Sequence, residues 1–184
     1  MQLPTARDLM VELDKYPHVQ DDCSLRQALE TFSDGHIEMH GECSLPRILL
    51  VFDQTGALLG LVRRRDILSG LSPRWFFKAD TQHPEAVFDV ALDENVSEVL
   101  ADKAIQRFRA RSDHAICEYI QPISGTVNRD DSLIRLVNIM VKKGYHMLPV
   151  VDDGHVIGVV RSVEVLWAVN QLLNGNEEKV HGEH

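Results

Sequence analysis

Long hydrophobic runs are missing from this 184-residue chain, in which no uninterrupted apolar stretch exceeds five residues. A membrane-spanning helix needs about 20 apolar residues, so the sequence predicts no membrane insertion. The first ten residues also lack the basic and then apolar layout of a secretory signal peptide. We therefore expect a cytoplasmic protein.

Cysteine and positive charge are also scarce. The 3 cysteines, Cys23, Cys43 and Cys117, form an odd count without CxxC spacing, which favours reduced thiols over a disulfide framework. None lies in a recognisable His/Asn context for nucleophilic catalysis. The formal net charge of −9 disfavours nucleic acid as the main partner, because phosphate contacts need a basic face. A content of 44% hydrophobic and 26% charged residues is typical of a globular protein.

An internal repeat organises the sequence. Residues 19–32 (VQDDCSLRQALETF) and 127–140 (VNRDDSLIRLVNIM) align at a constant offset, 127 − 19 = 108. Both segments pass from a short apolar strand through an acidic turn into an amphipathic run, which predicts a helix. Ser24 and Ser132 are the expected N-caps, and Gly144 is the expected C-cap of the later helix.

Two strands and a second helix are predicted to follow each of these helices. The strands cover residues 47–52 and 57–62 in the first copy and 146–151 and 155–160 in the second, where an Asp-Gly turn favours a hairpin. The second helices are expected over residues 64–71 and 162–173. Each repeat is thus β-α-β-β-α, with its first two strands parallel.

The predicted fold class is α/β (α+β), with two such repeats packed as a pseudo-twofold pair, because each sheet has one bare face to cover. We assign residues 1–71 to the first repeat, 72–115 to an inserted helical segment, 116–174 to the second repeat and 175–184 to a disordered tail. The insert contains SPRWFF and an amphipathic helix near residues 96–111.

The first repeat carries nine extra residues around the stretch HIEMHGECS. Residues 32 and 51 are 19 positions apart, against 10 for the equivalent residues 140 and 150. Gly35 and Gly41 favour a loop here. His36, His40 and Cys43 could ligate zinc, but no fourth ligand has a fixed spacing, so no metal site is assigned.

Several stretches of the second repeat resemble a CBS domain: ICEYIQP (116–122), GTVNRDDSL (125–133), GYHMLPVVDDG (144–154) and GVVRSVEVL (158–166). The first repeat resembles it chiefly by repeating the second. The chain is thus similar to a tandem CBS pair, or Bateman module. The resemblance implies a non-enzymatic regulatory protein that senses an adenine nucleotide (AMP, ADP or ATP) or S-adenosylmethionine in clefts between the repeats. It would act through a partner protein, without an obligatory cofactor.

The family's ligand pattern is a glycine, two apolar residues, Thr or Ser, two variable residues and Asp. The carboxylate meets the ribose, while the hydroxyl and the helix N-terminus face the phosphate. The pattern aligns with residues 60–66 and 158–164, but arginine replaces Thr/Ser in both copies and the second carboxylate is glutamate. Arginine is disfavoured at a helix start, so a bound polyphosphate or neighbouring carboxylates must offset it.

The resemblance implies two groups of ligand-binding residues. The sugar and phosphates would meet Arg63, Arg64, Asp66, Arg161 and Glu164, and the base would lie against His18, Thr126, Val127, Met147 and Pro149. Three alternatives stay open: residues 63–65 as solvated surface, Asp66 as a first-turn acid that stabilises its own helix, and Val127 as plain core.

The last predicted helix, SVEVLWAVNQLL, is apolar over more than the one stripe that a monomer buries. We therefore expect a homodimer. Trp75, Phe76 and Phe77 could serve the same contact or pack within the insert. The rival to nucleotide sensing is a ligand-free dimerisation or protein-interaction module.

Overall fold

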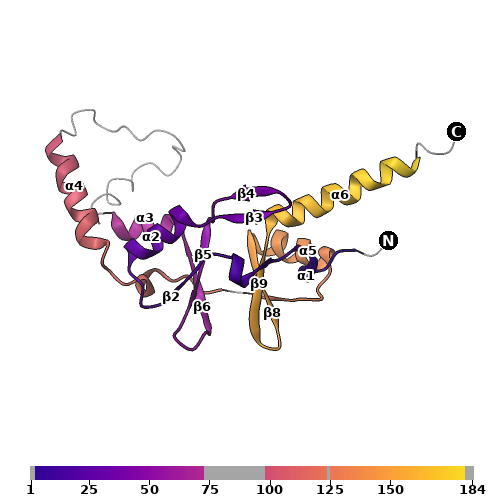
Figure 1. Ribbon diagram of the computed structural model, residues 1–184, viewed down its shortest axis with the longest axis horizontal. Helices are drawn as coiled ribbons and strands as arrows, with labels where there is room; N and C mark the ends of the chain where they lie inside the picture. The colour runs from indigo at the N-terminus through magenta and orange to yellow at the C-terminus, as the bar shows by residue number, and fades with distance from the viewer. Residues whose placement is uncertain (1–2, 73–97, 124, 181–184) are drawn as a thin grey trace. The chain divides into compact units, whose positions relative to one another are not determined.

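The computed structural model describes residues 3–72, 98–123 and 125–180 (Figure 1). The chain divides into two compact units that do not follow its order. Unit 1 comprises residues 1–17, 36–44 and 122–184, and unit 2 comprises residues 18–35 and 45–121. Residues 1–17 and 36–44, which the sequence places within the first repeat, therefore belong to the unit of the second repeat.

Unit 2 contains the β-α-β-β-α arrangement predicted for the first repeat. Its elements are β2 (His18–Gln20), α2 (Leu25–Asp34), β5 (Ile48–Phe52), β6 (Leu58–Arg63), α3 (Arg64–Leu71), α4 (Glu98–Arg111) and the 3-10 helix η3 (Ile116–Tyr119). The strand order is β2-β5-β6, with β2 parallel to β5 and β5 antiparallel to β6. The helix α2 supplies the crossover, as the repeat pattern predicts.

Capping chemistry sets the start of α2. The Gln27 backbone N–H donates to Ser24 Oγ at 3.3 Å, and the Ser24 backbone N–H donates to the side-chain Oε1 of Gln27 at 2.8 Å. Ser24 is thus the predicted N-cap, within a reciprocal capping box. The buried face of α2 joins a hydrophobic core that comprises Val19, Leu25, Ala28, Phe32, Leu49, Val51, Val62, Ile67 and Ile116.

Unit 1 contains the same arrangement for the second repeat, with additions. Its elements are α1 (Ala6–Leu9), β1 (Val11–Glu12), the 3-10 helix η1 (Leu13–Lys15), β3 (Ile37–Met39), β4 (Glu42–Ser44), β7 (Val127–Asn128), α5 (Leu133–Lys143), β8 (Met147–Asp152), β9 (His155–Arg161) and α6 (Ser162–Val180). The main sheet has the order β1-β9-β8-β7, in which β7 and β8 are parallel. Ser132 is the N-cap residue of α5, and Gly144 ends that helix with a left-handed backbone, φ 67°.

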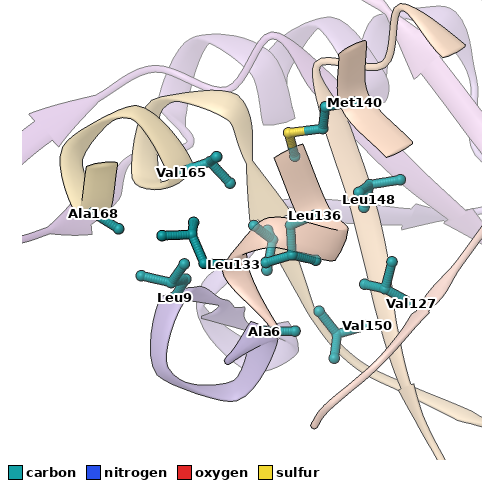
Figure 2. Close-up of a cluster of buried hydrophobic side chains, with 11 residues drawn as sticks. Ala6, Leu9, Val127, Leu133, Leu136, Met140, Leu148, Val150, Val165 and Ala168 are labelled. Atoms are coloured by element: carbon teal, nitrogen blue, oxygen red, sulfur yellow. The ribbon is translucent and has the colours of Figure 1, made fainter. Parts of the chain in front are cut away.

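The core of unit 1 lies between this sheet and its helices (Figure 2). Val127, Leu148 and Val150 contribute from the strands, and Leu133 and Leu136 contribute from α5. The lead-in helix α1 adds Ala6 and Leu9, which are 0% and 2% exposed. Residues that precede β2 of the first repeat therefore complete the hydrophobic core of the second.

Each repeat receives a short antiparallel segment at its last strand. In unit 1, β1 pairs with β9 through Val11 opposite Val159. In unit 2, Leu61 and Gln121 exchange two backbone hydrogen bonds of 3.0 and 2.8 Å. The added segment precedes β2 in one case and β7 in the other.

The extra residues of the first repeat form a β-hairpin, so the predicted loop is wrong. Strands β3 and β4 pair with Ile37 opposite Ser44 and Met39 opposite Glu42. His40 and Gly41 make the two-residue turn with φ of 54° and 78°. Two central residues of positive φ suit the twist of a tight hairpin.

Helix α6 extends beyond its expected end. It runs to Val180, so it includes residues 175–180, which the sequence analysis assigned to the tail. The Glu-Glu-Lys sequence at 177–179 has high helix propensity and continues the preceding turns. Residues 181–184 lie outside the described residues.

The helical insert is described over α4, which agrees with the helix expected near residues 96–111. Trp75, Phe76 and Phe77 lie outside the described residues, so their expected contacts are untested. Among the helices that the structure describes, none combines the length and apolar character needed to cross a membrane.

Candidate functional site

The ligand pattern of the first repeat lies at the junction of β6 and α3. Arg63 stands at the N-cap, and its backbone N–H donates to Asp66 Oδ2 at 2.9 Å. The guanidinium donates from Nε to Oδ2 at 2.8 Å and from Nη2 to Oδ1 at 2.9 Å. These bonds to the carboxylate raise the pKa of Arg63, so its side chain stays charged. Asp66 therefore supplies the local offset that arginine needs at a helix start.

The second repeat has the same device at the junction of β9 and α6. The backbone N–H of Arg161 donates to Glu164 Oε2 at 3.2 Å, and Nε lies 3.0 Å from both carboxylate oxygens. Nη2 also donates to Oε1. The side chains are 15% and 2% exposed, against 33% for Arg63 and 11% for Asp66. The pair in the second repeat is thus the more deeply buried of the two.

The carboxylates of Asp66 and Glu164 differ in how many further hydrogen bonds they can accept. A carboxylate oxygen offers two lone pairs. In Asp66, Oδ2 accepts two of the bonds from Arg63 while Oδ1 accepts one, which leaves an acceptor position on Oδ1. In Glu164, each oxygen accepts two bonds from Arg161. Asp66 can therefore receive a hydroxyl donor that Glu164 has no free position to accept.

Two side chains that the sequence did not indicate contact the second pattern. Ser44 Oγ accepts from Arg161 Nη1 at 2.8 Å. Tyr16 donates its hydroxyl to the sulfur of Met147 at 3.3 Å. Burial raises the pKa of Tyr16 well above its ordinary value, although the charge of Arg161 opposes the rise, so the phenol keeps its proton. Both residues precede the second repeat by more than 70 positions, and no local pattern pointed to them.

Positive charge surrounds the start of α3. The side chains of Arg64 and Arg65 are exposed, and the Arg64 amide donates to the Arg47 carbonyl at 3.4 Å. Arg47 is itself exposed. Within residues 3–72, 98–123 and 125–180, none of the three arginines has an ion pair within 4.0 Å. This arrangement suits an anionic group better than a neutral one.

The residues expected to meet a base fall into both units. His18 is exposed in unit 2, where its ring packs edge-on against Phe52 at 5.6 Å. In unit 1, Thr126 is exposed and Pro149 is buried. Val127 is 2% exposed within the hydrophobic core, in keeping with its alternative reading as plain core.

His40 and Cys43 of the hairpin lie apart, with different neighbours. His40 stacks on Trp167 of α6, with ring centroids 3.7 Å apart and an interplanar angle of 10°. Cys43 is exposed on β4 opposite Glu38. In the described portion of the chain, no three His, Cys, Asp or Glu side chains are grouped so that they could hold a metal ion.

The arginine-carboxylate pairs were within reach of sequence reasoning, because a capping residue and an acid three positions later is the spacing of a capping box. That spacing occurs in 63–66 and again in 161–164. The contacts of Ser44 and Tyr16 were not, since 117 and 131 positions separate the bonded residues.

Comparison with known proteins bears on the family and the fold of this chain. A family model described as "CBS domain" matches residues 6–73 and 118–170. The crystal structure of CBSX2 in complex with AMP is 20% identical, with a TM-score of 0.59 over 92% of this chain and 98% of that one. The CBS domain of a CBS-domain-containing membrane protein from Sphaerobacter thermophilus is 22% identical, with a TM-score of 0.61 over 91% and 88%.

A putative acetoin utilization protein from Vibrio cholerae is 17% identical, with a TM-score of 0.60 over 96% of this chain and 98% of that one. At these identities the likeness is one of fold. No curated protein matches the sequence.

Proposed function

Because this chain belongs to the CBS-domain family, we propose that it is a non-enzymatic regulatory module that senses an adenine nucleotide at its first ligand pattern. The observation that carries the proposal is the start of α3. There Asp66 keeps an acceptor position on Oδ1, and the exposed Arg64 and Arg65 lie beside it in sequence. A ribose hydroxyl can donate to Asp66 while phosphate oxygens meet the arginines. A structural neighbour crystallised with AMP supports this ligand class.

The ligand would be AMP, ADP or ATP, or S-adenosylmethionine, which shares the adenosine group but lacks phosphates. Three exposed arginines favour a phosphorylated ligand among these. The bound state would then be read by a partner protein, and the protein would act in the cytoplasm. No step of this role needs catalysis or a resident cofactor.

Nucleotide binding can be tested by melting temperature and calorimetry. At about 100 times its dissociation constant, a ligand specific for the folded state stabilises it by roughly 2.7 kcal/mol. We expect AMP, ADP or ATP to raise the melting temperature by several degrees, which follows from that energy for a chain of this size. Millimolar concentrations of all three without heat or stabilisation would overturn the proposal.

The role of the arginines can be tested separately from the fold. The double substitution Arg64→Gln with Arg65→Gln leaves the bonds between Arg63 and Asp66 intact. It should lower the affinity for ATP by roughly tenfold, because one charge-assisted contact is lost, while the affinity for adenosine changes little. Lys142→Gln with Lys143→Gln removes two exposed charges from α5 and serves as the control. Equal losses for ATP and adenosine would leave the arginines as solvated surface.

One observation favours the rival role as an interaction module. Val163, Leu166 and Leu173 are 54%, 68% and 65% exposed on α6. A second copy of the chain could bury these side chains, as the predicted homodimer requires. Dimerisation and nucleotide binding are compatible, so the dimer is part of the proposed function in either case.

A further inference from the structure

The hairpin β3–β4 is present in one repeat and contacts the ligand pattern of the other. By sequence it interrupts the first repeat between α2 and β5, but it belongs to unit 1. There Ser44 binds Arg161 and His40 stacks on Trp167. The hairpin therefore contacts both Arg161, the residue before α6, and Trp167, within the first two turns of α6.

The two pattern arginines differ at one nitrogen because of this hairpin. Arg161 Nη1 donates to Ser44 Oγ, while Nε and Nη2 donate to Glu164. The equivalent Arg63 uses Nε and Nη2 in the same way, and within the described ranges its Nη1 makes no hydrogen bond. Ser44 thus occupies the position on Arg161 that remains open on Arg63.

Tyr16 adds a second internal contact to this region. Its hydroxyl bonds the sulfur of Met147, and Met147 lies opposite Arg161 in the pairing of β8 with β9. Tyr16 is 3% exposed and Met147 is 7% exposed. Three residues predicted to meet a ligand in the second repeat, Met147, Arg161 and Glu164, therefore already have partners within the chain.

We infer that the hairpin is an internal occupant of the second ligand pattern, which a nucleotide reaches only after Ser44 leaves Arg161. This inference rests on the proposed function. A phosphate oxygen is a stronger acceptor for a guanidinium than a serine hydroxyl, so an anionic ligand can displace Ser44. The first pattern fills first, and the second fills when the hairpin is released. Nucleotide concentration would then control the position of the hairpin.

The test counts binding events for ATP and AMP by calorimetry on the full chain. Ser44→Ala removes the bond from Arg161, together with the 3.4 Å bond that the hydroxyl donates to the Ile37 carbonyl within the hairpin. His40→Asn removes the ring stack and keeps a residue that tolerates positive φ. Removal of residues 36–44 gives the first repeat the shorter connection of the second. Ser33→Ala is the matched control, because that exposed hydroxyl donates to the Leu29 carbonyl of its own helix at 3.0 Å.

Wild-type protein and Ser33→Ala should show one strong binding event per chain. Ser44→Ala and His40→Asn should show a second event, with a dissociation constant about tenfold lower than that of the weaker second event in wild type. Identical non-zero stoichiometry and affinities in all proteins would overturn the inference and leave the proposed function standing, as would two strong events in wild type. Absence of binding to every protein would overturn both. Because the point variants keep the hairpin, a misfolded deletion variant would not decide the outcome.

Discussion

At the scale of single residues, the arginine-carboxylate pairs explain how arginine stands at a helix start in both repeats. The carboxylate three residues later accepts both the backbone N–H and the guanidinium. Asp66 therefore does stabilise its own helix, as one reading of the sequence proposed. That role is compatible with ligand binding, because one Oδ1 position stays open.

The difference in burial between the pairs predicts a difference in stability. Arg161→Met leaves the 2% exposed Glu164 as an unpaired buried charge, which costs roughly 3–5 kcal/mol. Arg63→Met breaks a pair whose arginine is 33% exposed and should cost about 1 kcal/mol. Urea unfolding measures both values. Adding Glu164→Leu to Arg161→Met should restore most of the loss, and equal costs for the two arginine variants would contradict the argument.

The three cysteines should differ in reactivity. Burial, with the charges of Asp22 and Asp21, raises the pKa of Cys23 to about 11. A thiol with that pKa carries about a hundredfold less thiolate at pH 8 than one that titrates near 9, and the thiolate is the nucleophile. Cys43 and Cys117 are exposed and should be alkylated first by iodoacetamide at pH 8, as mass spectrometry can follow.

The same shift makes the stability fall in alkali. The Cys23 pKa is higher in the folded state, so the unfolded chain loses its proton first as pH rises. The contribution is fully present below pH 9 and declines between about pH 9 and 11. Cys23→Ala should flatten this part of the stability profile. Alkylation of Cys23 as fast as Cys43 would contradict the assignment.

At the scale of elements, the first glycine of each ligand pattern has a packing role. A Cβ on Gly60 would lie 2.5 Å from the Gln121 carbonyl oxygen, and one on Gly158 would lie 2.6 Å from that of Val11. Both glycines lie on the last strand of a repeat, where the added antiparallel segment approaches. Glycine is therefore needed for that approach, independently of any ligand.

Gly60→Ala and Gly158→Ala should each destabilise the protein by about 1–3 kcal/mol, because backbone atoms must shift to admit the methyl group. Gly125→Ala is the control, since its Cβ would meet the Tyr145 ring at an ordinary 3.6 Å. Thermal or urea unfolding measures the three variants. If all three matched wild type, the close approach would not constrain the fold.

At the scale of the whole molecule, each unit takes part of its hydrophobic core from a segment outside its β-α-β-β-α repeat. Ala6 and Leu9 complete the core of unit 1, and Ile116 lies in the core of unit 2. A fragment cut between the repeats would lose the residues that complete one core. We therefore expect neither contiguous half of the sequence to reproduce the stability of its unit.

The exposed side chains of α6 predict a homodimer at micromolar concentration. Leu166→Asp and Leu173→Asp should shift it towards monomer without unfolding, because these side chains are 68% and 65% exposed. Val141→Asp on α5, where the valine is 77% exposed, is the matched control. Light scattering measures the mass, and the 20.8 kDa monomer at every concentration would rule the dimer out.

The sequence by itself determined the repeated β-α-β-β-α order, the strand pairs and the helix caps. These features depend on local patterns: an apolar period, a serine before a helix, a glycine after one. The family resemblance also rested on contiguous stretches, and the matched family confirms it.

Only the tertiary structure decided what those elements contact. A hairpin replaced the expected loop, and its Ser44 bonded Arg161 across 117 positions of sequence. The lead-in strand β1 joined β9 of the other repeat. Such contacts depend on packing between distant segments, where one hydroxyl or one strand edge can pair with many partners. No local period or spacing in the sequence distinguishes among those partners. Only the folded chain therefore shows that Arg161 has a partner in Ser44 while, among the described residues, the equivalent nitrogen of Arg63 is open.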